Sequence, residues 1–167
     1  VRARRRRRSI GSQSAFGRGR RTAAEQDATL VALVDRVMRR LRGADLACRT
    51  VVLRLRFADY ERASRSASLP RPTRRTDSVL ALARELLEAA RPLIEARGGL
   101  TLIGVALTNL RDDDGAQLEL PLDGRPATLD DALDEVRDRF GTRAIRRAVL
   151  LDRDVGPAMP TLPDEDG

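Results

Sequence analysis

The order of two hydrophobic periodicities along the chain constrains its fold more than any other feature. Apolar residues recur at helical spacing over residues 22–42 and 76–91. The remaining ordered windows have the composition or the alternation of strands, and they cover residues 9–16, 48–57, 59–66 and 100–110. The order strand, helix, strand, strand, helix, strand predicts an α+β domain of the split βαβ (ferredoxin-like) type. Two helices would cover one face of a four-stranded sheet and leave the other face open.

Local signals sharpen two of these elements. Thr22 and Glu25 stand three residues apart at the start of the first helix, which is the spacing of a capping box, and Gly43 is a natural stop. In the strand at 48–57 the apolar residues share one parity, whereas Arg54 and Arg56 fall on the other. The pattern predicts a half-buried strand that presents arginine on the open face.

Charge is unevenly distributed between the two parts of the chain. Residues 1–110 hold 24 Arg against 10 acidic residues, whereas residues 111–167 hold 8 Arg against 15 acidic residues. All basic residues are Arg, whose guanidinium binds phosphate well and keeps its charge. The basic part, which opens with an arginine run at 1–8, favours nucleic acid as a partner, and the acidic part favours a protein partner.

Composition excludes several kinds of catalytic site. The chain has no His, which removes the usual general base and the commonest metal ligand. Cys48 is the only cysteine, so an intramolecular disulfide is impossible and a zinc cluster is not expected. The three consecutive acids at 112–114 precede Gly115 in a linker and point in different directions, so we expect no two-metal site there. We predict no catalytic residue, no metal and no small-molecule substrate in this chain, no membrane span, and a cytoplasmic location.

Three separated motifs resemble the little-finger domain of Y-family lesion-bypass DNA polymerases, in the branch of bacterial DNA polymerase IV. Residues 8–12 read Arg-Ser-Ile-Gly-Ser, and Phe16 follows. Residues 53–60 read Leu-Arg-Leu-Arg-Phe-Ala-Asp-Tyr, and residues 102–105 read Leu-Ile-Gly-Val. The motifs occur in the family's order, and the resemblance covers residues 1–110.

The resemblance implies that the domain holds primer-template DNA by its phosphates, without reading sequence. RNA-binding domains of the same topology stack bases on sheet aromatics, and the open face predicted here has none. One departure is that Thr101, Leu102 and Ala106 stand where family members often carry Arg, so we expect the last strand to contribute little beyond one threonine. The DNA-binding residues implied are Arg7, Arg8, Ser9, Gly11, Ser12, Arg54, Arg56, Arg62, Ser64, Arg65 and Thr108.

A short apolar peptide follows the basic domain. It resembles the bacterial sliding-clamp-binding peptide, and its binding residues would be Gln117, Leu118, Leu120 and Leu122. In this interpretation the glutamine hydrogen-bonds at the mouth of a pocket that the leucines fill as an extended anchor. The alternative is that the same leucines pack permanently on the domain itself.

The sequence is expected to divide into five segments. They are a basic linker (1–8), the little finger (9–110), a linker (111–127) that carries the clamp-binding peptide 117–122, a helical appendage (128–151) and a disordered tail (152–167). The resemblance places the palm and its Mg²⁺ before residue 1, so no cofactor is expected in this chain. One alternative is a catalytically dead Y-family adaptor that binds DNA and clamp. Another is a free-standing RNA- or ribosome-binding module.

Overall fold

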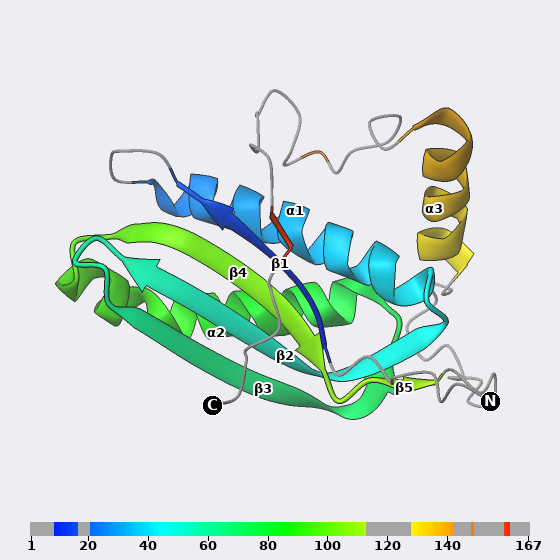
Figure 1. Cartoon of the computed structure of the whole chain (residues 1–167), viewed down its shortest axis with the longest axis horizontal. Coiled ribbons are helices and arrows are strands. Elements are labelled where there is room, and N and C mark those ends of the chain that lie inside the picture. Colours follow the sequence, from blue (N-terminus) through cyan, green and yellow to red (C-terminus); the bar gives the residue numbers. More distant parts are fainter. Residues whose placement is uncertain (1–8, 17–20, 113–127, 142–147, 149–158, 161–167) are drawn as a thin grey trace, which may run out of the picture.

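A computed structural model describes residues 9–16, 21–112, 128–141, 148 and 159–160 (Figure 1). Its first six elements follow the predicted order, and three further elements come after them. The elements are β1 (Ser9–Ala15), α1 (Ala23–Arg42), β2 (Leu46–Phe57), β3 (Arg62–Thr73), α2 (Thr76–Ala96), β4 (Leu100–Thr108), β5 (Arg111–Asp112), α3 (Thr128–Phe140) and β6 (Met159–Pro160).

The four long strands form an antiparallel sheet in the order β3-β2-β4-β1. Since β1 and β2 are both antiparallel to β4, they run parallel to each other with β4 between them. In the same way β2 separates β3 from β4. Each helix therefore joins two parallel strands that are split by a third, and this confirms the predicted split βαβ architecture.

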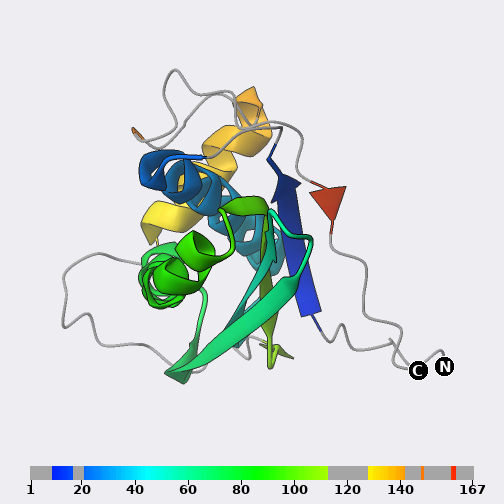
Figure 2. The ribbon, with the colours of Figure 1, turned by 90° about the vertical axis from the view of Figure 1, so that its left-hand side faces the viewer.

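Both long helices lie on one side of this sheet, and the other side is left without a helix (Figure 2). The sheet residues that face the helices include Leu53, Phe57 and Val105, each no more than 1% exposed. They pack against the apolar side of α1, where Leu33 and Leu41 are each 1% exposed or less. Complete burial of one such side chain stabilises the fold by roughly 1.5–3 kcal/mol. Apart from Phe57, the core is built mainly from aliphatic side chains, and it lies between the sheet and the helices.

The N-terminus of α1 has the capping box that the sequence predicts. The Glu25 backbone N–H donates to Thr22 Oγ1 at 3.2 Å, and the Thr22 backbone N–H donates to Glu25 Oε2 at 2.7 Å. These bonds satisfy two amides that the helix itself leaves without partners. They also hold the pKa of the Glu25 carboxyl below its usual value, with the Thr22 backbone as the main cause.

Two boundaries differ from those expected because of where the prolines lie. The second strand of the hairpin, expected at 59–66, instead continues as β3 through Pro70 and Pro72 to Thr73. Since β3 is the edge strand of the sheet, a proline there breaks no ladder bond on its outer side. Helix α2, expected over 76–91, passes Pro92 and continues to Ala96.

Two short strands extend the sheet. Strand β5 pairs with Leu46 and Ala47 at the start of β2, and β6 pairs with Ser12 and Gln13 on the outer edge of β1. That edge exposes backbone groups that two extended residues satisfy. Residues 159–160 belong to the segment that is expected to be a disordered tail, and the rest of 152–167 lies outside the described residues. In the described part of the chain no helix is long and apolar enough to cross a membrane.

Candidate nucleic-acid interface

The strand register defines the open face, meaning the side of the sheet that the helices leave uncovered. Leu53 of β2 pairs with Val105 of β4, and both side chains are buried beneath the helices. Side chains alternate between the two sides of a strand, so the next residues along, Arg54 and Gly104, belong to the open face. The full set is Ser9, Gly11, Gln13 and Ala15 of β1, Leu102, Gly104, Ala106 and Thr108 of β4, Thr50, Val52, Arg54 and Arg56 of β2, and Arg62, Ser64, Ser66 and Ser68 of β3.

Charge on this face has a single sign. Three arginines, Arg54, Arg56 and Arg62, lie on the neighbouring strands β2 and β3, and none of the open-face positions carries an Asp or a Glu. Guanidinium and hydroxyl groups are the donors that bind phosphate oxygens. An acid-free face with clustered arginines therefore attracts polyanions.

Specific contacts hold this surface in shape. Arg56 Nε donates to Thr101 Oγ1 at 3.1 Å, and Thr101 Oγ1 donates in turn to the carbonyl of Phe57 at 3.0 Å. Arg56 pairs with Arg62 across the β2–β3 ladder, so the two guanidinium stems start from adjacent positions. Two like charges directly opposite each other repel, and a bound anion would relieve this repulsion.

Gly104 in the middle of β4 sets the depth of the face. A Cβ at this position would lie 3.2 Å from the Cβ of Gln13 and 3.6 Å from the Cβ of Arg54. The neighbouring open-face residue on β4 is Ala106, which is also small. The surface of β4 is therefore low at Gly104 and Ala106, and the longer side chains of Arg54, Arg56 and Arg62 project from the neighbouring strands β2 and β3.

Seven of the predicted DNA-binding residues belong to the open face. The register brings together Ser9, Gly11, Arg54, Arg56, Arg62, Ser64 and Thr108. Their phosphate contacts remain a prediction. Arg7, Arg8 and the peptide 117–122 lie outside the described residues.

Two predicted residues are directed away from this face. Ser12 shares the parity of Val105, is 1% exposed, and has a buried hydroxyl with no hydrogen-bond partner among the described residues. Its side chain is therefore directed towards the helices, and its phosphate contact stays a prediction. The sequence did not show this orientation, because β1 is polar on both parities and carries no alternation that would mark its buried side. Arg65 pairs with Leu53 and so leaves β3 on the helix side, apart from Arg62 and Ser64.

The open face also carries polar residues that the sequence analysis did not single out. Thr50 Oγ1 and Ser68 Oγ lie 2.7 Å apart, and Asn109 Nδ2 donates to Thr50 Oγ1 at 2.7 Å. Gln13 lies beside Gly104 on the same face. The serines at alternate positions of β3 carried the signal that would have found Ser68. Within the described residues, no group of three or more His, Cys, Asp or Glu side chains could hold a metal ion.

Comparison with known proteins identifies the class to which this fold and face belong. Residues 7–120 match the model of the impB/mucB/samB family C-terminal domain. The chain is 33% identical over 155 residues to DNA polymerase IV 2 of Mesorhizobium japonicum, an alignment that covers 85% of this chain and 37% of that protein. It is 34% identical over 149 residues to DNA polymerase IV of Moorella thermoacetica, covering 86% of this chain and 35% of that protein.

The fold is shared with a solved structure, and a second one is similar. A Dbh ternary complex matches 60% of this chain and 28% of that chain, with a TM-score of 0.52 and 14% sequence identity. A complex of the beta-clamp processivity factor and the little finger domain of PolIV matches 68% of this chain and 99% of that chain, with a TM-score of 0.48 and 24% identity.

This chain belongs to the impB/mucB/samB family, as its C-terminal domain, and its resemblance to the DNA polymerase IV branch is confirmed. It spans about a third of the length of the curated relatives that it matches.

Proposed function

We propose that this chain grips primer-template DNA through its open face, as the little finger of a translesion DNA polymerase, and docks on the sliding clamp through residues 117–122. The observation that carries the first part is the acid-free open face, on which Arg54, Arg56 and Arg62 cluster. Phosphates are common to every DNA sequence, so such a face binds duplex DNA with little sequence preference.

The DNA part is tested by fluorescence anisotropy with primed duplexes of two unrelated sequences. We expect the two dissociation constants to agree within about threefold, because phosphate contacts carry little sequence information. Arg54→Ala together with Arg56→Ala should weaken both complexes equally. Arg84→Ala with Arg91→Ala is the matched control, since these arginines lie on α2 and pair with Asp27 and Glu88. Tight binding to only one of the duplexes would contradict the proposal.

The clamp part is supported by the peptide pattern and by its place directly after the DNA-binding domain. Three leucines at alternate positions of an extended peptide fill pockets on one side of it, each worth roughly 1.5–3 kcal/mol before the cost of ordering the segment. We therefore expect a micromolar dissociation constant, which corresponds to a binding free energy of about −8 kcal/mol. Pro121 helps because it limits the conformations that are lost on docking.

Isothermal titration with a bacterial sliding clamp tests this part. We expect Gln117→Ala with Leu120→Ala to abolish binding and to leave DNA affinity unchanged. Glu119→Ala is the matched control, because that side chain occupies the variable position of the pattern. If the wild-type chain does not bind the clamp and the double variant has a lower melting temperature than the wild type, the leucines pack on the protein itself and the proposal fails.

We propose further that nucleotide transfer is carried out by another part of a longer polypeptide. No catalytic carboxylate pair is evident in the sequence, and the chain covers only about a third of its polymerase relatives. The purified chain should extend no primer with any template or divalent metal ion. Template-dependent extension by a preparation free of other polymerases would refute this.

A further inference from the structure

The turn between β2 and β3 carries the most exposed aromatic side chain of the protein. The chain has three Phe, one Tyr and no Trp. Phe57 is buried and Phe16 is half-buried, whereas Tyr60 is 78% exposed. A tyrosine ring combines a flat apolar face with a polar hydroxyl, and such rings are enriched where proteins meet their partners. Tyr60 is therefore well placed to contact a partner at the end of the sheet.

Tyr60 has a backbone conformation that does not suit its side chain. Its φ is 67°, in the left-handed region, where bulky residues are uncommon and where glycine would fit without strain. Hydrogen bonds nevertheless fix the turn. The Tyr60 N–H donates to the carbonyl of Phe57 at 3.1 Å, and the Glu61 N–H donates to Asp59 Oδ1 at 3.1 Å. The fold does not need an aromatic ring at this exposed position, so the strain favours a role in binding.

Contacts with the end of α2 hold the turn on the domain. Arg97, at the C-cap of α2, places Nη1 2.8 Å from Asp59 Oδ2, and its guanidinium lies 5.6 Å from the centre of the Phe57 ring. The Ala58 N–H donates to the carbonyl of Gly99 at 3.0 Å. These contacts occupy the Asp59 carboxylate and leave Tyr60 on a rigid support.

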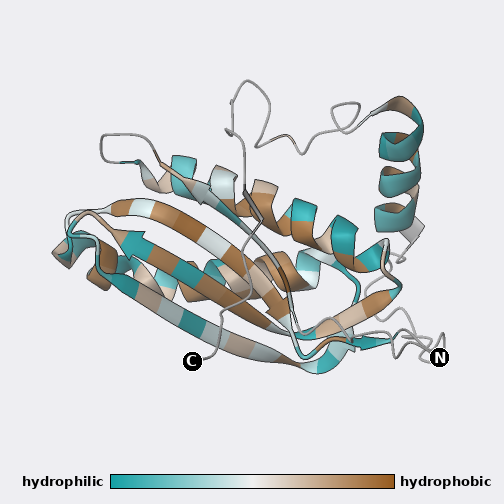
Figure 3. Cartoon of the chain, in the orientation of Figure 1, coloured by the Kyte–Doolittle hydropathy of each residue, from teal (hydrophilic) through white to brown (hydrophobic). Residues whose placement is uncertain are grey.

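The turn lies beside a positively charged end of the open face. Arg56 and Arg62 pair directly before the turn, and Leu102 pairs with Arg56 on the other side. The Phe57 N–H donates to the carbonyl of Glu61 at 2.9 Å, so these two residues are opposite each other and by alternation belong to the helix side. Strand β2 alternates between hydrophilic and hydrophobic residues, whereas β4 beside it is mainly hydrophobic (Figure 3). We call the two arginines and the exposed tyrosine the hairpin end of the open face.

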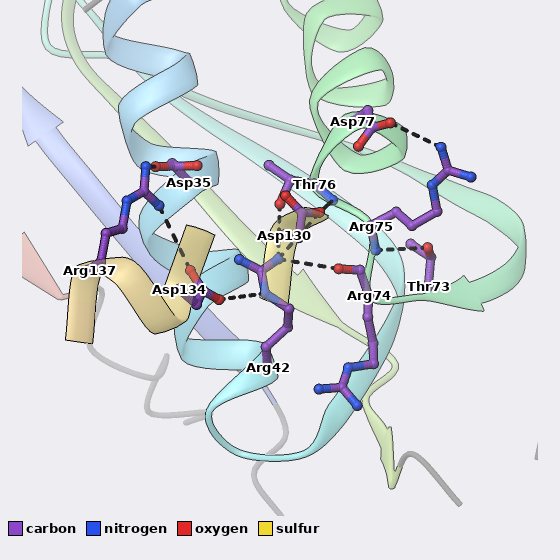
Figure 4. Close-up of polar contacts among 10 residues, drawn as sticks. All are labelled: Asp35, Arg42, Thr73, Arg74, Arg75, Thr76, Asp77, Asp130, Asp134 and Arg137. Carbon is purple, nitrogen blue, oxygen red and sulfur yellow. Dashed lines mark hydrogen bonds and ion pairs between the residues drawn. The ribbon is translucent and has the colours of Figure 1, made fainter. Parts of the chain in front are cut away.

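Arginines at the other end of the domain bind the protein's own carboxylates. Arg42 Nε donates to Asp134 Oδ2 at 2.6 Å, and its Nη1 lies 3.7 Å from Asp130 Oδ2 (Figure 4). Arg137 Nη2 lies 2.6 Å from Asp35 Oδ2. The side chains of the two arginines are only 5% and 7% exposed. This cluster joins α3 to α1, away from the β2–β3 turn (Figure 1). The hairpin end is therefore the better place for an anion from outside the protein.

We propose that the hairpin end of the open face holds one unpaired nucleotide of a single-stranded template: Arg56 and Arg62 contact its phosphate, and the ring of Tyr60 stacks on its base. This inference rests on the proposed DNA-binding function. Paired bases are already stacked on their neighbours, so an exposed ring gains most from a base that has no pairing partner. Every base has a flat π-face, so this contact needs no sequence preference.

Fluorescence anisotropy with the full chain compares two DNA probes, a blunt duplex and the same duplex with a single-stranded template overhang. We expect Tyr60→Ala to bind the overhang probe about five- to tenfold more weakly than the wild type does, because stacking on one base is lost. Its affinity for the blunt duplex should stay within about twofold of the wild type, because phosphate contacts remain. Tyr60→Phe keeps the ring and should bind both probes as the wild type does.

Tyr60→Gly separates binding from folding. Glycine adopts a positive φ without strain, so this variant should be more stable than Tyr60→Ala in thermal melts. Both variants should nevertheless lose the same affinity for the overhang probe, because both lack the ring. If the loss of affinity is smaller for the more stable variant, the turn acts through folding and the inference fails.

The single tyrosine also gives a direct signal from this site. When fluorotyrosine replaces tyrosine, the fluorine NMR spectrum contains one protein resonance, from Tyr60. We expect the overhang probe to shift this resonance and the blunt duplex to leave it nearly unchanged. Equal responses to the two probes, or equal affinities of the wild type and Tyr60→Ala for the overhang, would overturn the inference and leave the proposed grip on duplex DNA intact. If the wild type binds neither probe, the proposed function fails and the inference fails with it.

Discussion

Replacement of Arg42 by methionine tests how much the ion pairs between Arg42 and the α3 residues Asp130 and Asp134 contribute to the free energy of unfolding. Arg42→Met keeps the length and apolar character of the stem but removes the cation between Asp130 and Asp134. Breaking a buried ion pair by removing one partner costs about 3–5 kcal/mol, because the remaining charge lacks compensation. Undocking of α3 lets the two carboxylates hydrate and lowers this cost, so we expect about 2–4 kcal/mol. The variant also loses the bond from Arg42 to Thr76.

Urea unfolding followed by circular dichroism measures this cost. With a slope of about 2 kcal/mol per molar urea, the expected loss lowers the midpoint by about 1–2 M. Arg84→Met is the matched control: its pair with Asp27 spans 2.7 Å, but the side chains are 46% and 29% exposed. An exposed pair of this kind contributes less than about 1 kcal/mol.

A double substitution distinguishes lost packing from uncompensated charge. Arg42→Met with Asp134→Leu removes one of the two carboxylates together with the cation. Apolar replacement of a buried pair is often close to neutral, so we expect the double variant to regain more than half of the lost stability. Arg42 does not stabilise the protein through these ion pairs if Arg42→Met destabilises it no more than Arg84→Met does, or if the double variant is less stable than the single one.

Three further predictions concern the core and the cap. Burial raises the pKa of the Cys48 thiol from 9.0 to about 12, so the unfolded chain loses this proton at a lower pH than the folded one. The free energy of unfolding should therefore fall as the pH rises from 9.0 towards 12. In urea titrations over this range, Cys48→Ala should remove the part of the pH dependence that comes from the thiol. Thr22→Ala should cost about 1 kcal/mol in thermal melts through loss of the capping box, and an equally stable variant would contradict the cap geometry. Leu53→Ala, at a fully buried position of β2, should cost about 2–5 kcal/mol in urea unfolding, and a loss below about 1 kcal/mol would place the core elsewhere.

The predictable part of the structure is the part that has strong periodicity. The apolar repeat from Leu30 to Leu41 is compatible only with an amphipathic helix, and the alternation from Val51 to Phe57 only with a half-buried strand. The order of elements and the open-face position of Arg54 and Arg56 follow from these two patterns. The capping box is local, because it needs only Thr22 and Glu25.

The remaining features depend on contacts between residues far apart in sequence. The burial of Ser12 follows from the pairing of β1 with β4, because a strand with serine on both parities does not show which side is inward. Arg42 forms ion pairs with Asp130 and Asp134, about ninety residues further along the chain. A single sequence does not reveal which of its many arginines pairs with which acidic residue. Strand β3 continues through Pro70 and Pro72 because it lies at the edge, which is a property of the whole sheet.

The salt dependence of DNA binding tests the role of the open face most directly. With about 4–6 phosphates engaged, a fourfold rise in salt concentration should weaken binding of the wild type by roughly two to three orders of magnitude. Arg54→Ala, Arg56→Ala and Arg62→Ala combined should lower the slope of log affinity against log salt by about 2–3. Arg84→Ala, Arg91→Ala and Arg97→Ala combined remove the same charge from other surfaces and should leave the slope within about 1 of the wild type. Equal slopes for the two triple variants would contradict the account.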